Sequence, residues 1–327
     1  MNKRKGTFLV LFVVFILSIL ISIRIGSVDV TYKDIWQALT TETGGVIGII
    51  RNIRIPRVLM AVMIGANLAV SGVLLQGVMN NPMADPGITG ISAGASVVVM
   101  IVMLYIPEAI ASMPIFGFIG GVFACFLIYS LAWKQGLSPM RIVLAGVAVN
   151  SILGGISSML QILNSEDLTG VLNWLNGELG KKSWEQVKYV VIYSAVGLLL
   201  AFLLHRCLDV LALGDKNTRS LGYNPNVLRI LISGVAVMLA GISTAYVGII
   251  GFIGLVVPHI SRMLVGSEHK KLIPFAAMTG SSMLLLADTI GRTIISPYEV
   301  PVGVITTVFG GPFFLYLLRK DSNGYGD

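Results

Sequence analysis

The feature that most constrains this chain is a series of apolar runs, each long enough to cross a bilayer, which recur along almost its whole length. A transmembrane helix needs about 20 consecutive apolar residues. Only 12% of the residues are charged, whereas soluble domains contain roughly 25%. The sequence therefore predicts an all-α, polytopic membrane protein with no separate soluble domain.

Ten apolar runs have a suitable length. They cover residues 8–25, 56–79, 91–106, 114–133, 142–163, 188–205, 228–248, 251–265, 272–296 and 303–318. The third and eighth runs are short and rich in glycine, which predicts broken or tilted helices that pack inside the protein, because irregular backbone is not tolerated against lipid. We expect a single transmembrane domain over residues 1–327.

The distribution of basic residues predicts the orientation of the chain. An even number of spans places both termini on one side, and the basic start, Lys3, Arg4 and Lys5, places that side in the cytoplasm by the positive-inside rule. Most of the 23 Lys and Arg residues, Arg229 among them, fall on the same side. The net charge of +7 is thus explained by the cell membrane, and no basic stripe or arm indicates a nucleic-acid partner.

An internal repeat is visible between the two halves of the chain. Arg57-Val58-Leu59 matches Arg229-Ile230-Leu231, and further matches at the same offset join Ala69-Val70-Ser71 to Gly241-Ile242-Ser243, Pro86 to Pro258 and Gly94 to Gly266. We expect repeat halves over 56–165 and 228–318. Five spans separate the copies, so the repeat would be inverted, a common plan in transporters. Chance similarity between two glycine-rich apolar helices is the alternative.

Between the second and third spans the chain cannot continue as a helix. Pro82 and Pro86 each lack a backbone donor, and Gly87 permits a turn. The segment is either a connecting turn or a re-entrant element beside a translocation path.

Polar side chains inside the spans form a second group of candidates. Asn67, Gln76 and Asn150 are amides that are costly to bury without partners, so they face either neighbouring helices or a wet translocation path. Asp288 and Arg292 stand four residues apart on the ninth span, in the favourable acid-first order for an ion pair.

The most polar segment on the cytoplasmic side lies within residues 206–226. Its central residues include Leu213, Gly214, Asp215, Arg219, Ser220, Leu221 and Gly222. Connections need only a few residues, so a segment of this length predicts a surface that another protein grips. The alternative is a solvated basic turn.

No catalytic, metal-binding or cofactor-binding constellation is found. His205, His259 and His269 are scattered without ligand spacing, and Cys125 and Cys207 lie far apart. If the chain uses ATP hydrolysis, we expect the hydrolysis to take place in a separate chain.

Several motifs resemble those of one membrane-protein family. They are Arg54-Ile55-Pro56-Arg57, Gly72-Val73-Leu74-Leu75-Gln76, Asn81-Pro82-Met83-Ala84-Asp85-Pro86-Gly87, Leu144-Ala145-Gly146-Val147-Ala148, Trp174-Leu175-Asn176-Gly177, Gly251-Phe252-Ile253-Gly254-Leu255-Val256-Val257-Pro258-His259, Ala287-Asp288, Glu299-Val300-Pro301-Val302-Gly303 and Gly311-Pro312-Phe313-Phe314. In this order they resemble the permeases of type II ABC importers for iron-siderophore complexes, haem and cobalamin, over nearly the whole chain.

The resemblance implies a set of partners and a mechanism. Two permease subunits, identical or paralogous, would surround a central path above two ABC ATPase subunits, and a substrate-binding protein would deliver the cargo from outside. The segment from Leu213 to Gly222 would dock into the ATPase, and Arg54, Arg57 and Arg292 would accept acidic residues of the binding protein. An inner gate before the fifth span is implied only weakly, since Ser138-Pro139-Met140-Arg141 departs from the family pattern.

The predicted function is therefore import by alternating access, with an iron(III)-siderophore complex as the favoured cargo. Cobalamin and haem remain alternative cargoes, because the permeases for them share these motifs. An ion-coupled secondary transporter would need an unpaired carboxylate in the membrane, for which Asp288 is the one candidate. A membrane scaffold or assembly factor is a further alternative.

Overall fold

The chain folds into a bundle of apolar helices. The computed structural model describes residues 3–26, 28, 30–40, 45–87, 89–134, 136–164, 168–180, 182–296 and 298–322. The ten apolar helices are α1 (Lys3–Arg24), α4 (Ile55–Met79), α5 (Ile91–Tyr105), α6 (Met113–Ala132), α7 (Pro139–Leu163), α9 (Trp184–Leu203), α12 (Pro225–Val247), α13 (Ile253–Val265), α14 (His269–Thr293) and α15 (Val302–Ser322). Each corresponds to one predicted run, and the all-α polytopic fold is confirmed.

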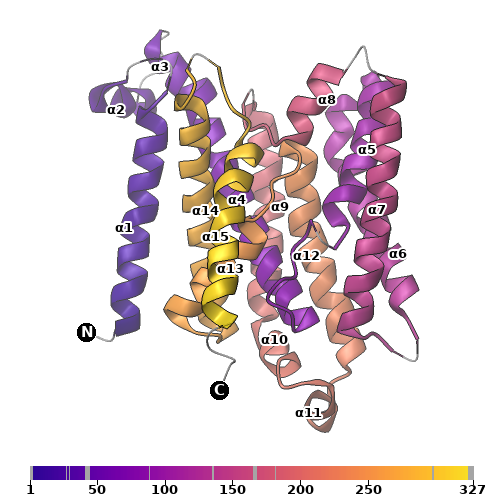
Figure 1. Cartoon of the computed structure of the whole chain (residues 1–327). Coiled ribbons are helices and arrows are strands. Elements are labelled where there is room, and N and C mark those ends of the chain that lie inside the picture. Colours follow the sequence, from indigo (N-terminus) through magenta and orange to yellow (C-terminus); the bar gives the residue numbers. More distant parts are fainter. Residues whose placement is uncertain are drawn as a thin grey trace.

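Shorter helices connect the apolar ones at the two ends of the bundle. They are α2 (Tyr32–Thr40), α3 (Val46–Ile49), a π-helical turn (Ile50–Arg54) continuous with α4, a 3₁₀ turn (Pro107–Ser112), α8 (Leu168–Leu175), α10 (His205–Leu211) and α11 (Asp215–Ser220). Figure 1 shows α2 and α3 at one end, hereafter the α2 end, and α10 and α11 at the other, the α11 end. Helix α1 begins and α15 ends at the α11 end, so both lie on one side of the bundle, as an even number of spans requires.

Two of the ten helices are too short to cross a bilayer alone. Seven helices are long and apolar enough to span. Of the other three, α15 has 21 residues in all, whereas α5 has 15 and α13 has 13. At 1.5 Å per residue the two reach about 22 Å and about 20 Å, less than the ~30 Å hydrocarbon core. Each follows an irregular stretch within the bundle, and Phe252 before α13 has a left-handed φ of 68°. The short third and eighth runs are thus broken elements, as predicted.

Helix α4 is the central helix and packs through its glycines. A Cβ at Gly65 would lie 2.4 Å from the carbonyl oxygen of Gly280 on α14, and one at Gly72 would lie 1.9 Å from that of Gly254 on α13. Small residues let membrane helices approach until their backbones touch, which supplies van der Waals contact where lipid provides no hydrophobic driving force. The position of α4 against α13 and α14 therefore depends on these glycines.

Substituting Gly72 with alanine should separate α4 from α13, since the added methyl group would meet backbone that cannot rotate away. We expect the free energy of unfolding to fall by about 1–3 kcal/mol, the usual cost of overpacking. Gly154→Ala on α7 is the matched control, because a Cβ there meets nothing within 4 Å. Thermal unfolding in detergent measures both, and equal unfolding temperatures would contradict the packing account.

The two helices that begin the sequence repeat run in opposite directions. Helix α4 starts at the α2 end, whereas α12 starts beside α11 and runs back (Figure 1), and the two contact each other through a hydrogen bond of 2.9 Å from Ser71 Oγ to the carbonyl of Ala236. Opposite directions are what an inverted repeat requires, and the repeat halves over 56–165 and 228–318 stay a prediction. Beyond these helices the matches do not mark equivalent positions: Pro86 lies in the turn before α5, whereas Pro258 lies inside α13.

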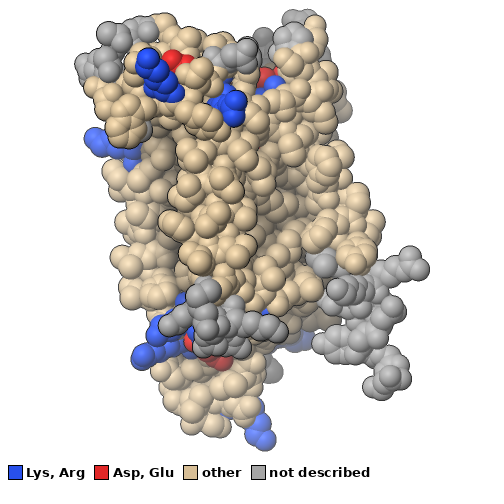
Figure 2. All heavy atoms as spheres, turned by 90° about the vertical axis from the view of Figure 1, so that its left-hand side faces the viewer, with Lys and Arg blue, Asp and Glu red and all other residues tan. Residues whose placement is uncertain are grey.

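The surface of the bundle is that of a membrane protein. On the face shown in Figure 2, the described charged residues gather towards the two ends and leave an uncharged belt between them. Leu9, Phe12 and Leu17 of α1 and Leu144 and Met159 of α7 are among the large apolar side chains exposed on the bundle. The belt is the part of the surface that hydrocarbon covers.

Candidate functional site

A cluster of charged residues lies inside the α2 end. The carboxylate of Asp288, 2% exposed, accepts hydrogen bonds from Arg57 Nε at 3.1 Å and Nη2 at 2.9 Å. Arg292 Nε lies 3.1 Å from the same carboxylate, so the predicted Asp288–Arg292 ion pair forms. Arg57 Nη1 also pairs with Glu299 at 2.8 Å. Asp288 is therefore neutralised by two arginines rather than free to bind an ion.

The other two predicted docking arginines bind the C-terminal end of α1. Arg54 Nη1 donates to the carbonyls of Ile23 and Arg24 at 2.6 and 2.7 Å, and Arg292 donates to the carbonyls of Ser22 and Ile25 at 3.0 and 3.1 Å. The last carbonyls of a helix have no partners within it and attract positive charge. These buried side chains thus fasten α1 to α4 and α14, a structural role that the sequence did not indicate.

A small pocket opens beside Arg57. It has a volume of about 270 Å³, and its polar lining includes Asn173, Glu178 and Glu299. Lys182, outside the membrane-spanning segments, lies close by and donates to the carbonyl of Tyr246 at 2.9 Å. Burial lowers the pKa of Lys182 to about 8, an effect that Arg57 reinforces and Glu178 opposes. The pocket therefore combines acidic and basic groups near the surface.

Two of the predicted pathway amides are buried between helices. Asn67 donates to Ser194 Oγ on α9 at 2.7 Å, and Gln76 donates to the carbonyl of Gly254 at 3.3 Å while accepting a hydrogen bond from Arg262. These are the interhelical hydrogen bonds expected of amides in a membrane interior. Asn150 on α7 is half-buried and donates to the carbonyl of Gly87 at 2.7 Å.

The segment with the two prolines is an irregular turn within the bundle. Helix α4 ends at Met79, and the chain becomes helical again at Ile91. A Cβ at Gly254 would lie 2.9 Å from Cδ of Pro86, so the turn packs on the start of α13. Pro82 is exposed, whereas Pro86 is buried. The interruption of the helix is confirmed, and part of the turn lies against α13 rather than in solvent.

Helix α11 projects from the opposite end of the bundle (Figure 1). Gly214 and Gly222 flank it with φ of 87° and 84°, values that favour glycine and turn the chain into and out of the helix. Leu213 and Leu221 are more than half exposed, and Arg219 and Ser220 are exposed as well. Asp215 pairs with the buried Arg229 of α12. The segment thus presents apolar side chains in the aqueous region, on a framework fixed to the bundle.

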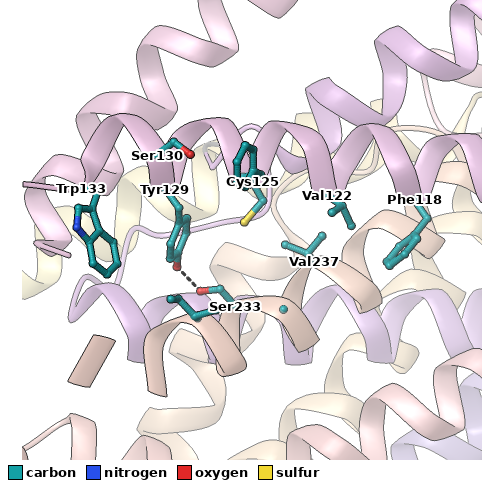
Figure 3. Close-up of a pocket in the computed structure, with 11 residues that line it drawn as sticks. Phe118, Val122, Cys125, Tyr129, Ser130, Trp133, Ser233 and Val237 are labelled. Atoms are coloured by element: carbon teal, nitrogen blue, oxygen red, sulfur yellow. Dashed lines mark hydrogen bonds between the residues drawn. The ribbon is translucent and has the colours of Figure 1, made fainter. Parts of the chain in front are cut away.

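An apolar pocket lies between α6 and α12 (Figure 3). Its volume is about 540 Å³, and its lining includes Phe118, Cys125, Tyr129 and Trp133. Tyr129 and Ser233 are joined by a hydrogen bond across it. The largely aromatic and aliphatic lining suits hydrocarbon and offers little to a charged solute. Within the described part of the chain, no cluster of three or more His, Cys, Asp or Glu could hold a metal ion.

Comparison with known proteins gives relatives along almost the whole chain. The Fe(3+)-citrate import system permease protein YfmD of Bacillus subtilis (strain 168) is 38% identical over 328 residues, which cover 98% of this chain and 97% of the relative. The "Probable heme-iron transport system permease protein IsdF" of Staphylococcus aureus (strain Newman) is 37% identical over 317 residues, with 97% and 96% coverage.

Solved structures have the same fold. A metal-chelate type ABC transporter in an inward-facing conformation matches with a TM-score of 0.86 and 28% identity, over 97% of this chain and 99% of that one. PsaBC from Streptococcus pneumoniae, solved with a Fab, shares the fold with a TM-score of 0.62 at 17% identity, over 87% and 94% of the two chains. The model of the FecCD transport family matches residues 14–320. The chain therefore belongs to the FecCD transport family of ABC importer permeases, as its motifs predicted.

Proposed function

We propose that the chain is the permease subunit of an importer for iron(III) complexes of the siderophore type, driven by separate ABC ATPase subunits. The observation that carries this proposal is the 38% identity to an Fe(3+)-citrate import permease across 98% of the chain. A similar identity to the haem-iron relative makes haem the second candidate. Cobalamin stays an alternative by family resemblance alone.

The α11 end is proposed to face the cytoplasm and bind the ATPase. The basic residues Lys3, Arg4 and Lys5 lie at the start of α1, at this end, which agrees with the positive-inside rule. The exposed Leu213 and Leu221 flank α11 and give this segment an apolar contact surface of the kind found at the centre of protein interfaces. Gly214, Asp215, Arg219, Ser220 and Gly222 complete this docking segment.

The α2 end is proposed to receive the loaded binding protein. Arg57 is the arginine that an incoming carboxylate reaches most readily, because it lines the small pocket and its partner Glu299 is 54% exposed. Arg54 and Arg292 bind the carbonyls at the end of α1. We therefore assign them to the same docking site in a supporting role, in which they hold its helices in place. Complementary charges at such a surface set the rate and orientation of encounter.

The translocation path is proposed to run beside α7, where a second permease subunit completes it. Helix α7 is largely exposed in the single chain, and Cβ atoms added at Gly154 and Gly155 would meet nothing within 4 Å. Asn150 lies on this helix and joins it to the turn at Gly87. Asn67 and Gln76 of α4 form hydrogen bonds to α9 and α13. They would support the path by holding these two helices to α4.

An ion-coupled mechanism is disfavoured by the surroundings of Asp288. A coupling carboxylate must bind and release its ion or proton in the membrane. Asp288 is instead held by Arg57 and Arg292 and is 2% exposed. Asp288 thus has the environment of a structural ion pair.

Growth of a strain that lacks only this gene tests the cargo. Under iron limitation, the deletion should abolish growth on ferric citrate or a defined ferric siderophore, and a plasmid copy should restore it. Growth on haem iron and cobalamin-dependent growth are the parallel measurements. Loss of growth on haem alone would replace the proposed cargo with haem, and loss of cobalamin-dependent growth alone would replace it with cobalamin.

A further inference from the structure

Arg229 is the largest side chain that the described core buries completely. It lies in the first turns of α12 and is 1% exposed. An isolated buried charge is costly, and such a group persists only where its hydrogen-bonding capacity is satisfied. The partners of Arg229 therefore show which segments the fold must keep together at the α11 end.

The guanidinium of Arg229 joins α12 to three other segments. Nη2 donates to Asp215 Oδ1 at 2.7 Å and Nη1 to Oδ2 at 3.1 Å, which makes a two-point contact with the first residue of α11. Nη1 also donates to the carbonyl of Leu137 at 3.2 Å, and Nε to that of Val78 at 3.4 Å. One planar group thus connects α11, the segment before α7 and the last turn of α4.

Leu137 is held from both sides by the start of α12. Its N–H donates to Asn226 Oδ1 at 3.1 Å, and its carbonyl accepts from Arg229. Helix α7 begins two residues later, at Pro139. Arg141 closes the turn by donating to the carbonyls of Lys134 and Gly136 at 2.9 and 3.0 Å. The entry to α7 is therefore fastened to α12 rather than free in solvent.

Two-point carboxylate–guanidinium contacts fix distance and direction together, in a way that a single lysine contact does not. Asp215 is 42% exposed on α11, whereas its partner is buried in the bundle. A displacement of α11 that broke the contact would strand the buried charge of Arg229. Moving the attached segments along with α11 is the less costly response.

We propose that Arg229 is a positioning residue that transmits displacement of α11 to the entry of α7 through Leu137. The inference rests on the proposed docking of α11 to the ATPase. Helix α7, which we place beside the path, would then shift with the ATPase-bound helix. The last turn of α4, bound through Val78, would shift with it and carry the proline-containing turn that follows.

The test uses the complete importer, with ATPase and binding protein, in proteoliposomes. Arg229→Lys keeps the charge but cannot make the two-point contact together with both carbonyl bonds. We expect uptake of ferric citrate per ATP hydrolysed to fall about tenfold, while copurification with the ATPase and ATP hydrolysis stay within twofold. Arg206→Lys on α10 is the matched control, because Arg206 is exposed at the same end, and it should leave the ratio unchanged.

A spin label at position 138 separates transmission from mere folding. Ser138→Cys, in a chain whose Cys125 and Cys207 are replaced by alanine, should report an ATP-dependent change of mobility that Arg229→Lys abolishes. If Arg229→Lys does not accumulate, Asp215→Glu, which keeps the charge and shifts the contact, serves for two measurements, uptake per ATP hydrolysed and the label response, both taken only on complexes that have assembled with the ATPase, because Asp215 itself belongs to the docking segment. An assembled Arg229→Lys or Asp215→Glu complex with native uptake per ATP and native label response would overturn the inference. If instead the proposed docking of α11 to the ATPase were wrong, substitutions in α11 would leave copurification of the permease with the ATPase unchanged.

Discussion

Replacing Leu221 with aspartate should reduce copurification of the permease with its ATPase by at least about a hundredfold and bring ATP-driven uptake to background. Leu221 is 55% exposed in the single chain. A carboxylate introduced where an apolar contact is desolvated costs several kcal/mol, and central interface positions account for a large share of binding energy. Pull-down from detergent and uptake in proteoliposomes measure the two effects.

Asn217→Asp is the control for this substitution. It introduces the same carboxylate one turn away, at an exposed polar position of α11, and gives up only the hydrogen bond that Asn217 donates to the carbonyl of Leu213. We expect binding of the ATPase to change by less than threefold. Native binding by the Leu221→Asp variant would remove α11 from the ATPase interface.

Asp288→Asn should be the most damaging substitution for the folding of the chain. It removes the negative charge that lies between Arg57 and Arg292 and leaves two guanidinium groups close together in a buried site. Removing one partner of a buried ion pair destabilises by about 3–5 kcal/mol. Thermal unfolding in detergent and the yield of folded protein measure the effect.

Glu299→Gln is the matched control, because it makes the same chemical change in another carboxylate that binds Arg57. Its side chain is 54% exposed, and exposed ion pairs contribute about 0–1 kcal/mol. Equal losses of stability in the two variants would show that the charge of Asp288 is not the source of the effect.

The helices were predictable because the bilayer imposes a length and a composition on every segment that crosses it. That rule placed each of the ten apolar helices within a few residues. It also identified the shortened α5 and α13 from their length and glycine content. It could not predict α2, α3 or α8, which are too short to stand out as spans, or the left-handed Phe252 before α13.

The charged residues were predicted less well because their partners are distant in the sequence. Arg229 was counted only as one of the basic residues on the cytoplasmic side, yet it is 1% exposed, since residues as far away as Val78 and Leu137 supply acceptors. Arg54 and Arg292 were expected at a docking surface and bind the carbonyls of α1. The pattern of apolar runs predicts how deep in the membrane a residue lies, but it does not predict which helix packs against that residue.

The repeat gains a physical meaning from these arginines. Arg57 and Arg229 begin the matched stretches, and each is largely buried and paired with an acidic residue, Asp288 at the α2 end and Asp215 at the α11 end. The inverted orientation of α4 and α12 thus places one buried arginine near each face of the bundle. One of them lies in the proposed site for the binding protein, and the other lies in the proposed connection to the ATPase.

Energy supply is the most direct test of the whole account. Labelled ferric citrate and the binding protein are presented to vesicles that contain the permease, with or without the ATPase, and with ATP or an imposed ion gradient as the energy source. The account predicts uptake only when both the ATPase and ATP are present. Uptake by the permease without the ATPase, driven by the ion gradient, would contradict it.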